Sequence, residues 1–182
     1  MPTDVLIIKG SPRKGGNSDL LADAFAGGVI DAGWDVVIRR AADMKISGCL
    51  GCGHCFREKG VCVQKDDMTD FLEEYKSAKA LAFASPIYYW GITAQLKALI
   101  DRTYALLPFG KTGKDVVLLF TCGDNTTETS RPAISMFHQI ISYSGWTEKG
   151  TITAPGLHKP GEIKGKPVLE RARELGKSFL QY

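Results

Sequence analysis

Long hydrophobic runs and an export signal are absent from this sequence of 182 residues. The apolar stretches are short, for example Val5–Ile8 and Val116–Phe120. A membrane-spanning helix needs about 20 apolar residues. The N-terminus has no basic segment followed by an apolar region and a small-residue cleavage site. We therefore expect a cytoplasmic protein with no membrane association, whose cysteines lie in a reducing compartment.

A strong excess of charge of one sign is also absent. Lys and Arg number 23, Asp and Glu number 20, and no long basic run concentrates the formal net charge of +3. This balance argues against a nucleic-acid-binding protein. The hydrophobic fraction of 44% and the charged fraction of 24% are ordinary for a globular protein and argue against extensive disorder. We expect residues 1–182 to form a single domain.

Short apolar runs alternate with amphipathic patterns along the chain, which predicts alternating strands and helices. The expected strands are 4–9, 34–39, 80–84, 115–121 and 146–153, and the expected helices are 18–32, 66–76, 92–105, 132–144 and 168–180. Gly27 and Gly28 weaken the first helix by about 1 kcal/mol each relative to Ala, so we expect close packing there. Residues 44–65 do not fit the alternation and read as a cysteine-rich insertion.

The order of these elements predicts an α/β fold. The first, third and fourth strands are apolar on both faces, as in a parallel sheet covered by helices on each side. Right-handed crossovers between five βα units give a doubly wound, five-stranded parallel sheet in the order 2-1-3-4-5. Ligands of such sheets bind at the carboxyl ends of the strands, which here are followed by the loops 10–18, 85–91 and 121–127.

The loop after the first strand, Gly10-Ser-Pro-Arg-Lys-Gly-Gly-Asn-Ser18, has the chemistry of an anion site. A helix N-terminus presents unpaired N–H groups and a partial positive charge, while Ser11, Asn17 and Ser18 can donate hydrogen bonds and Arg13 adds charge. The loop matches neither the P-loop nor the dinucleotide fingerprint G-x-G-x-x-G. A single phosphate therefore suits it better, although a polar turn with an N-cap at Asn17 or Ser18 explains the same residues.

The loop after the third strand, Ser85-Pro-Ile-Tyr-Tyr-Trp-Gly91, places three aromatic residues where a ligand is expected. A planar heteroaromatic ring needs an apolar stacking surface and backbone N–H groups at its edge. The same aromatics are equally typical of a core or a subunit interface.

These two loops, together with Gln95-Leu-Lys-Ala-Leu-Ile-Asp-Arg102, resemble the NADPH-dependent FMN reductases of flavodoxin-like fold over nearly the whole chain. The cysteine segment followed by Lys65-Asp-Asp-Met68 resembles the iron-sulfur flavoprotein branch of that family. The resemblance implies FMN and a homodimer or homotetramer. It implies that the phosphate is held by Ser11, Arg13, Asn17 and Ser18, and that the flavin ring meets Pro86, Ile87, Tyr88, Trp90, Gly91, Thr121, Cys122 and Gly123.

Four of the five cysteines follow the spacing Cys49-x2-Cys52-x2-Cys55-x6-Cys62. Two consecutive C-x2-C steps followed by a fourth cysteine are typical of a [4Fe–4S] cluster, and nearby glycines allow the tight turns that it needs. A zinc site, a thioredoxin-like dithiol and four inert thiols remain alternatives. We expect Cys122 to be a small buried residue and not a cluster ligand.

Other polar residues carry weaker predictions. His54, His138 and His158 read as surface or interface residues, and Asp66-Asp67 read as the start of a helix, where carboxylates favour the dipole. The default role of Lys97, Asp101 and Arg102 is a salt-bridged helix face or a subunit contact.

The sequence thus favours an FMN-dependent oxidoreductase. We expect it to take electrons from NAD(P)H, or from a reduced carrier such as ferredoxin, and to pass them through the flavin to a small acceptor or an iron-sulfur cluster. No residue stands out as an acid–base catalyst. A non-enzymatic flavodoxin-like electron carrier and a zinc-binding interaction module are the alternatives.

Overall fold

The computed structural model describes residues 4–180, which form a three-layered α/β fold. Its five strands are β1 (Val5–Lys9), β2 (Val36–Arg40), β3 (Ala80–Pro86), β4 (Asp115–Thr121) and β5 (Thr147–Ala154). They form one sheet in the order β2-β1-β3-β4-β5, and each neighbouring pair is parallel. The doubly wound sheet with strand order 2-1-3-4-5 is therefore confirmed.

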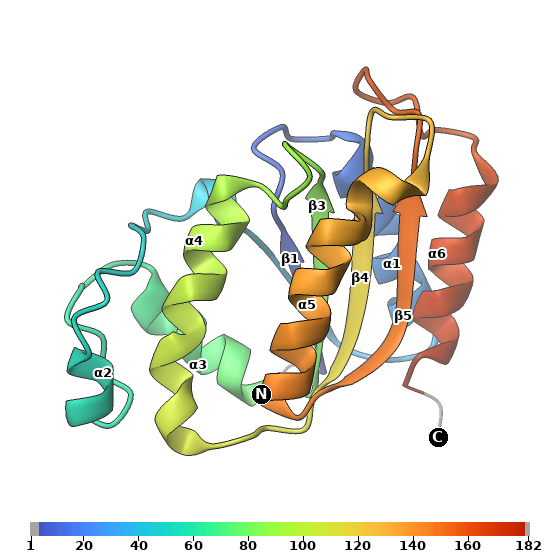
Figure 1. The fold of residues 1–182 in the computed structure, drawn as a ribbon. Coiled ribbons are helices and arrows are strands. Elements are labelled where there is room, and N and C mark those ends of the chain that lie inside the picture. Colours follow the sequence, from blue (N-terminus) through green and yellow to red (C-terminus); the bar gives the residue numbers. More distant parts are fainter. Residues whose placement is uncertain (1–3, 181–182) are drawn as a thin grey trace.

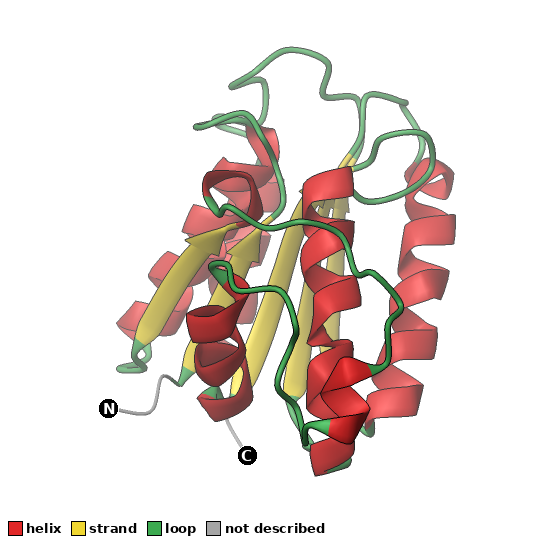
Figure 2. Cartoon of the chain, turned by 90° about the vertical axis from the view of Figure 1, so that its left-hand side faces the viewer, coloured by secondary structure: helices red, strands yellow, loops and turns green. Residues whose placement is uncertain are grey.

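Helices cover both faces of the sheet (Figure 1, Figure 2). The α-helices are α1 (Asn17–Asp31), α2 (His54–Arg57), α3 (Met68–Ser77), α4 (Ala94–Arg102), α5 (Arg131–Ser144) and α6 (Pro167–Ser178), and short 3-10 helices are η1 (Ala41–Asp43), η2 (Thr103–Phe109) and η3 (Thr127–Ser130). Helices α1 and α6 lie on one face, and α3, α4 and α5 lie on the other. Across residues 4–180, none of these helices combines the length and the hydropathy that crossing a membrane requires.

Burial of the strands follows their position in the sheet. Strand β1 is buried throughout, and β3 and β4 are buried except at one end, because helices cover both of their faces. The edge strand β2 is partly exposed. Successive side chains of β1 enter different cores: Leu6 and Ile8 pack under α3–α5, whereas Val5 and Ile7 pack under α1 and α6.

Helices α1 and α6 touch backbone to backbone. A Cβ on Gly28 would lie 1.9 Å from the carbonyl oxygen of Arg173, and a Cβ on Gly176 would lie 2.2 Å from that of Phe25. Any side chain at these positions would force the two helices apart. Close packing, as expected, is therefore the reason for a glycine at position 28 in a helix that it weakens.

Most element boundaries lie within one or two residues of the expected ones, and the differences in β2 and α4 have local reasons. Strand β2 begins at Val36 because the N–H of Trp34 donates to Val29 O at 3.2 Å and so belongs to the end of α1. Helix α4 begins after Thr93, whose side chain accepts from the N–H of Leu96 and caps the helix. It ends at Arg102, where η2 follows, and α2 lies within the cysteine-rich insertion.

Candidate functional site

The loops at the carboxyl ends of β1, β3, β4 and β5 enclose a small cavity, here called the strand-end cavity. Its volume is about 200 Å³, and it is lined by Ser11, Arg13, Gly16, Asn17, Ser18, Pro86, Ile87, Tyr88, Thr121, Cys122, Gly123, Leu157, His158 and Pro160. Figure 1 shows these loops together at the top of the sheet. Of the residues expected to contact the flavin or its phosphate, all but Trp90 and Gly91 line this cavity.

The first turn of α1 forms one wall of the strand-end cavity. Its N-cap is Gly16, which has no side chain with which to cap the helix. The hydroxyl of the buried Ser11 accepts from the N–H of Arg13 at 3.1 Å and fixes the turn that carries the Arg13 side chain. Open N–H groups at a helix N-terminus, a serine and an arginine together suit a phosphate.

An ion pair beneath this loop holds it in shape. The buried Asp19 accepts from the N–H of Gly15 at 2.8 Å and from Arg40 Nη1 at 3.0 Å. Arg40 Nη1 also donates to Ser11 O at 2.9 Å. Hydrogen bonding to Asp19 raises the pKa of Arg40. Sequence reasoning missed this pair, although Asp19 in the first helical turn and Arg40 at the end of the neighbouring strand were visible signals.

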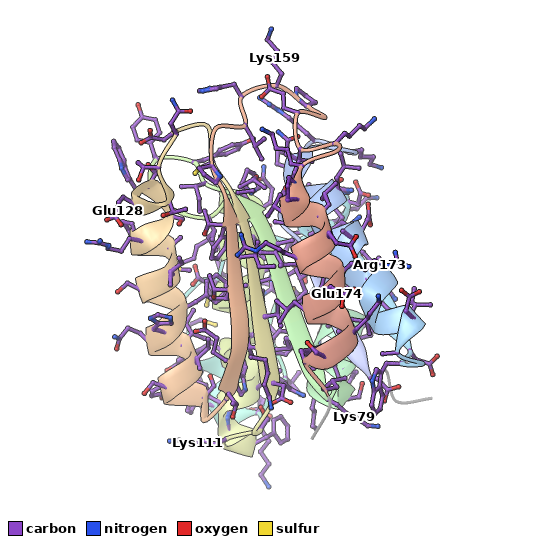
Figure 3. The ribbon with its side chains drawn as sticks, turned by 90° about the vertical axis from the view of Figure 1, so that its right-hand side faces the viewer. Lys79, Lys111, Glu128, Lys159, Arg173 and Glu174 are labelled. Atoms are coloured by element: carbon purple, nitrogen blue, oxygen red, sulfur yellow. The ribbon has the colours of Figure 1, made fainter. Side chains whose placement is uncertain are left out.

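The β5–α6 loop, which sequence reasoning did not assign to a site, forms another wall. Asn17 joins it to α1, since its Nδ2 donates to Lys159 O at 2.9 Å and its Oδ1 accepts from the N–H of Ile163 at 3.3 Å. The Asn17 side chain is thus engaged with the chain itself, while its position still borders the cavity. Figure 3 shows Lys159 at the tip of this loop, above the strand ends. His158 is exposed, as expected, and also lines the cavity.

The loop after β3 ends in a tight turn that carries exposed aromatic rings. Tyr88 and Gly91 exchange two backbone hydrogen bonds of 2.9 and 3.0 Å. The two residues between them, Tyr89 and Trp90, have φ of +48° and +60°, a conformation that is rare and strained for bulky side chains. The side chain of Tyr89 is 97% exposed and that of Trp90 is 59% exposed. Backbone strain and exposed aromatic surface next to a cavity are typical of a binding site.

The cysteine-rich insertion encloses a second cavity, here called the cysteine cavity. Its volume is about 560 Å³, and it is lined by Cys49, Leu50, Gly51, Cys52, Gly53, Cys55, Phe56, Cys62, Val63, Gln64, Asp101, Arg102, Tyr104 and Ala105. All four cysteines of the motif therefore face one space. It borders the C-terminal end of α4 and the start of η2, which Figure 1 shows far from the strand ends.

The local structure of the insertion aims backbone groups and thiols at the same place. Gly51 and Gly53 have φ of +63° and +66°, so that the chain turns sharply between successive cysteines, as only glycine does without strain. The N–H of Gly51 donates to Cys49 Sγ at 3.4 Å. Phe56 packs on Tyr104 with ring centroids 5.0 Å apart and holds α2 against η2.

The thiols of the motif are free and close enough to affect one another. Burial raises the pKa of Cys55, and the neighbouring Cys62, Cys49 and Cys52 raise it further. Within residues 4–180, however, no three His, Cys, Asp or Glu side chains converge as the ligands of one metal ion do. A tetrahedral zinc site needs such convergence, whereas a [4Fe–4S] cluster binds each thiolate at a different iron and spreads them apart. The donor set fits the cluster better than zinc.

The expected salt bridge of Arg102 is present, but its partner is Asp66, beside the cysteine-rich insertion, and not a residue of α4. Arg102 is only 2% exposed and lies in the wall of the cysteine cavity. Its Nη1 and Nη2 donate to Asp66 at 2.8 and 2.9 Å, and Nη1 also donates to Ser47 O at 3.0 Å. Asp66 therefore anchors Arg102, while Lys97 and Asp101 form the expected salt bridge along the face of α4 at 2.6 Å.

Comparison with known proteins agrees with this geometry. The family model described as NADPH-dependent FMN reductase matches residues 3–153. A solved NAD(P)H:quinone oxidoreductase from Methanothermobacter marburgensis has the same fold, with a TM-score of 0.79 and 22% identity, and the alignment covers 100% of this chain and 98% of that one.

Two curated relatives carry the name iron-sulfur flavoprotein. One, from Archaeoglobus fulgidus, is 32% identical over 96% of this chain and 77% of its own length. The other, from Methanocaldococcus jannaschii, is 32% identical over 97% of this chain and 95% of its own length. The chain therefore belongs to the NADPH-dependent FMN reductase family, in its iron-sulfur flavoprotein branch.

Proposed function

We propose that this protein binds FMN across the strand-end cavity and a [4Fe–4S] cluster in the cysteine cavity, and that it moves electrons from NAD(P)H or a reduced carrier to a small acceptor. Bound FMN would accept a hydride and release electrons singly, and a bound cluster would take up and release one electron at a time. The observation that carries the proposal is the presence, in one chain of this family, of a phosphate-suited cavity and a four-thiol cavity.

In this proposal, the first turn of α1 holds the flavin phosphate. The N–H groups behind Gly16 and the side chains of Ser11, Arg13 and Ser18 supply donors and positive charge. Asp19 and Arg40 keep this loop in a binding shape before the ligand arrives, which reduces the entropy lost on binding. The Asn17 side chain is already bonded to Lys159 and Ile163 and forms part of the cavity wall. Asn17 would therefore contribute its backbone N–H, and not its side chain, to phosphate binding.

The flavin ring would lie outside the enclosed part of this cavity. A volume of about 200 Å³ is below the roughly 300 Å³ of an ordinary small-molecule site, so it accommodates only part of a flavin nucleotide. Pro86, Ile87 and Tyr88 offer apolar surface at the cavity mouth, and Trp90 and Gly91 continue it at the strained turn. Thr121, Cys122 and Gly123 form the opposite edge.

The exposed rings of Tyr89 and Trp90 favour a homodimer or homotetramer. Large aromatic side chains of this exposure are typical of subunit interfaces. A second copy seated on this turn would cover the flavin ring and exclude water from it. Sedimentation of the purified protein, with and without a Tyr89→Ser substitution, measures this assembly.

In the cysteine cavity, Cys49, Cys52, Cys55 and Cys62 would be the four cluster ligands. The N–H of Gly51 already donates to the sulfur of Cys49, and such bonds stabilise thiolate charge. None of these side chains needs to act as an acid or a base, because the protein's task is to position the two groups and to tune their potentials.

Anaerobic purification followed by a visible spectrum and by assays of FMN, iron and acid-labile sulfide tests the proposal. We expect about one FMN and about four irons and four sulfides per chain, consistent with a single [4Fe–4S] cluster. We further expect steady-state oxidation of NADH or NADPH when free flavin, quinone or dioxygen is added.

Other outcomes identify the alternatives. FMN without turnover of NADH or NADPH, and with reduction only by ferredoxin-like carriers, indicates an electron carrier. Zinc without flavin, in a colourless protein, indicates a metal-binding interaction module and overturns the proposal.

A further inference from the structure

We propose that Arg102 is a positioning residue for the cysteine cavity, where its Nε–H donates to the Cys62 sulfur of a bound [4Fe–4S] cluster and raises the cluster's reduction potential. The inference rests on the proposed function, because it requires a cluster in that cavity. It goes further by assigning a role to a residue outside the cysteine motif.

The unsatisfied atom of Arg102 is the first observation. Arginine has five N–H donors and no acceptor, and a buried donor without a partner is costly. The two terminal nitrogens are engaged with Asp66 and Ser47. Of all the buried side-chain nitrogens and oxygens in residues 4–180, Nε of Arg102 is the one that has no hydrogen-bond partner. A buried donor of this kind is explained when a ligand completes its surroundings.

The surroundings of Arg102 indicate the type of acceptor. Its side chain lines the cysteine cavity together with all four thiols. Asp66 and Cys62 both raise the pKa of Arg102, although burial alone would lower it, so the Cys62 side chain lies close enough to the guanidinium to act on its charge. Since Asp66 is already engaged by the terminal nitrogens, Cys62 is the acceptor that we assign to Nε. A thiolate bound to iron accepts hydrogen bonds that a neutral thiol accepts only weakly.

Asp66 fixes the direction in which Nε points. It accepts from both terminal nitrogens of Arg102, which is the planar two-point contact that holds a guanidinium in one orientation. The N–H groups of Met68 and Ser47 in turn donate to Asp66, at 3.2 and 3.5 Å. The pairing also cancels the net charge of the arginine, so that the directed N–H bond remains as its main effect on the cavity.

The electronic consequence follows from charge. Reduction adds one electron, and so one negative charge, to the cluster and its thiolates. A hydrogen bond to a ligating sulfur stabilises the more negative form, which raises the reduction potential. Removing one charge-assisted hydrogen bond costs about a factor of ten in an equilibrium constant, and a factor of ten corresponds to about 59 mV for a one-electron couple.

The test is a double substitution that leaves the net charge unchanged, Arg102→Met with Asp66→Asn. Anaerobically purified protein is assayed for iron and sulfide and titrated with dithionite in the presence of mediators, with the cluster followed by EPR. In the double variant, we expect the oxidised cluster to be favoured about tenfold more than in the wild type, so that the reduction potential of the cluster falls by about 59 mV. The matched control is Arg39→Met with Glu74→Gln, which removes a similar two-point ion pair between β2 and α3 whose residues do not line the cysteine cavity. Its cluster potential should equal that of the wild type.

Each outcome decides between the inference and the proposed function. A fully loaded double variant with the wild-type potential overturns the inference. A folded, flavin-containing double variant that has lost its iron and sulfide shows only that the Arg102–Asp66 pair holds the insertion together, and the potential of Arg102→Lys then decides the inference. If circular dichroism shows that the double variant is unfolded, Arg102→Lys, which keeps the charge but has no Nε, decides by the same shift. Wild-type protein without iron and sulfide overturns the proposed cluster instead.

Discussion

The strand-end cavity and the cysteine cavity lie at opposite ends of α4 and are built by different means. The first is formed by loops that leave four neighbouring strands, so the sheet itself brings its residues together. The second is formed within the cysteine-rich insertion, which is attached through the ion pair of Asp66 with Arg102 and the ring contact of Phe56 with Tyr104. One site is thus a property of the fold, and the other is added to it.

This difference predicts that the two sites can be lost separately. The strand-end cavity depends on buried strands whose register is fixed, whereas the cysteine cavity depends on turns at Gly51 and Gly53 and on ligand bonds. Metal ligation contributes folding free energy to small loops that have little core of their own. Substitutions in the insertion should therefore change the cluster content, and substitutions at the strand ends should change the affinity for flavin.

The largest expected effect comes from Cys52→Ser. We expect complete loss of cluster iron and sulfide with FMN retained, because the strand-end cavity does not contact the insertion. Iron, sulfide and FMN assays on the same preparation measure both. The matched control is Cys122→Ser, which changes the buried cysteine of the strand-end cavity and should keep its iron. Simultaneous loss of flavin in Cys52→Ser would contradict the separation.

The same division explains what could be predicted from the sequence. Strand order and most of the strand-end cavity were predictable, because apolar runs define a parallel sheet and its ligands lie at the strand ends. Leu157, His158 and Pro160 were missed because their loop has no motif and reaches the cavity through Asn17. Arg102 was assigned to a salt-bridged helix face or a subunit contact, because helical periodicity cannot show that its ion-pair partner Asp66 lies beside an insertion.

The next effect concerns the ion pair that shapes the phosphate loop. Arg40→Met leaves the buried Asp19 without its partner, which should lower the free energy of unfolding by about 3 kcal/mol. FMN affinity should fall as well, since Arg40 also holds Ser11 O. Urea unfolding and flavin titration measure the two effects. The neighbouring Arg39 pairs with Glu74 at the surface, so Arg39→Met should cost less than about 1 kcal/mol. Equal losses of unfolding free energy in Arg40→Met and Arg39→Met would show that the Arg40–Asp19 ion pair has no special role.

A smaller effect is expected from Arg13→Ala, which removes charge from the strand-end cavity without disturbing a pair. We expect FMN to bind about tenfold more weakly, as for the loss of one charge-assisted hydrogen bond, with unchanged iron content. Lys14 is the control, because it is exposed, pairs with Asp43 at 3.1 Å and does not line the cavity. Flavin fluorescence titrations of Arg13→Ala and Lys14→Ala should therefore differ, and equal affinities would remove Arg13 from the phosphate site.

The smallest effect concerns a lysine that belongs to neither site. Lys114 directly precedes β4, and Figure 3 shows Lys111 of the same loop at the end of the sheet opposite Lys159. Lys114 is buried and donates to Lys76 O at 2.9 Å and to Ala78 O, and burial lowers its pKa to about 8. Between pH 8 and the ordinary value of 10.5, the unfolded chain binds more protons than the folded chain, so stability rises with pH there.

This contribution cannot exceed about 1.4 kcal/mol per pH unit, which is the limit for one proton. Lys114→Met should remove that part of the slope from urea unfolding measured between pH 8 and 10, although its overall stability falls with the two lost hydrogen bonds. FMN and iron content should be unchanged, because the residue lines neither the strand-end cavity nor the cysteine cavity. A slope identical to that of the wild type would mean that the carbonyl oxygens of Lys76 and Ala78 keep Lys114 charged.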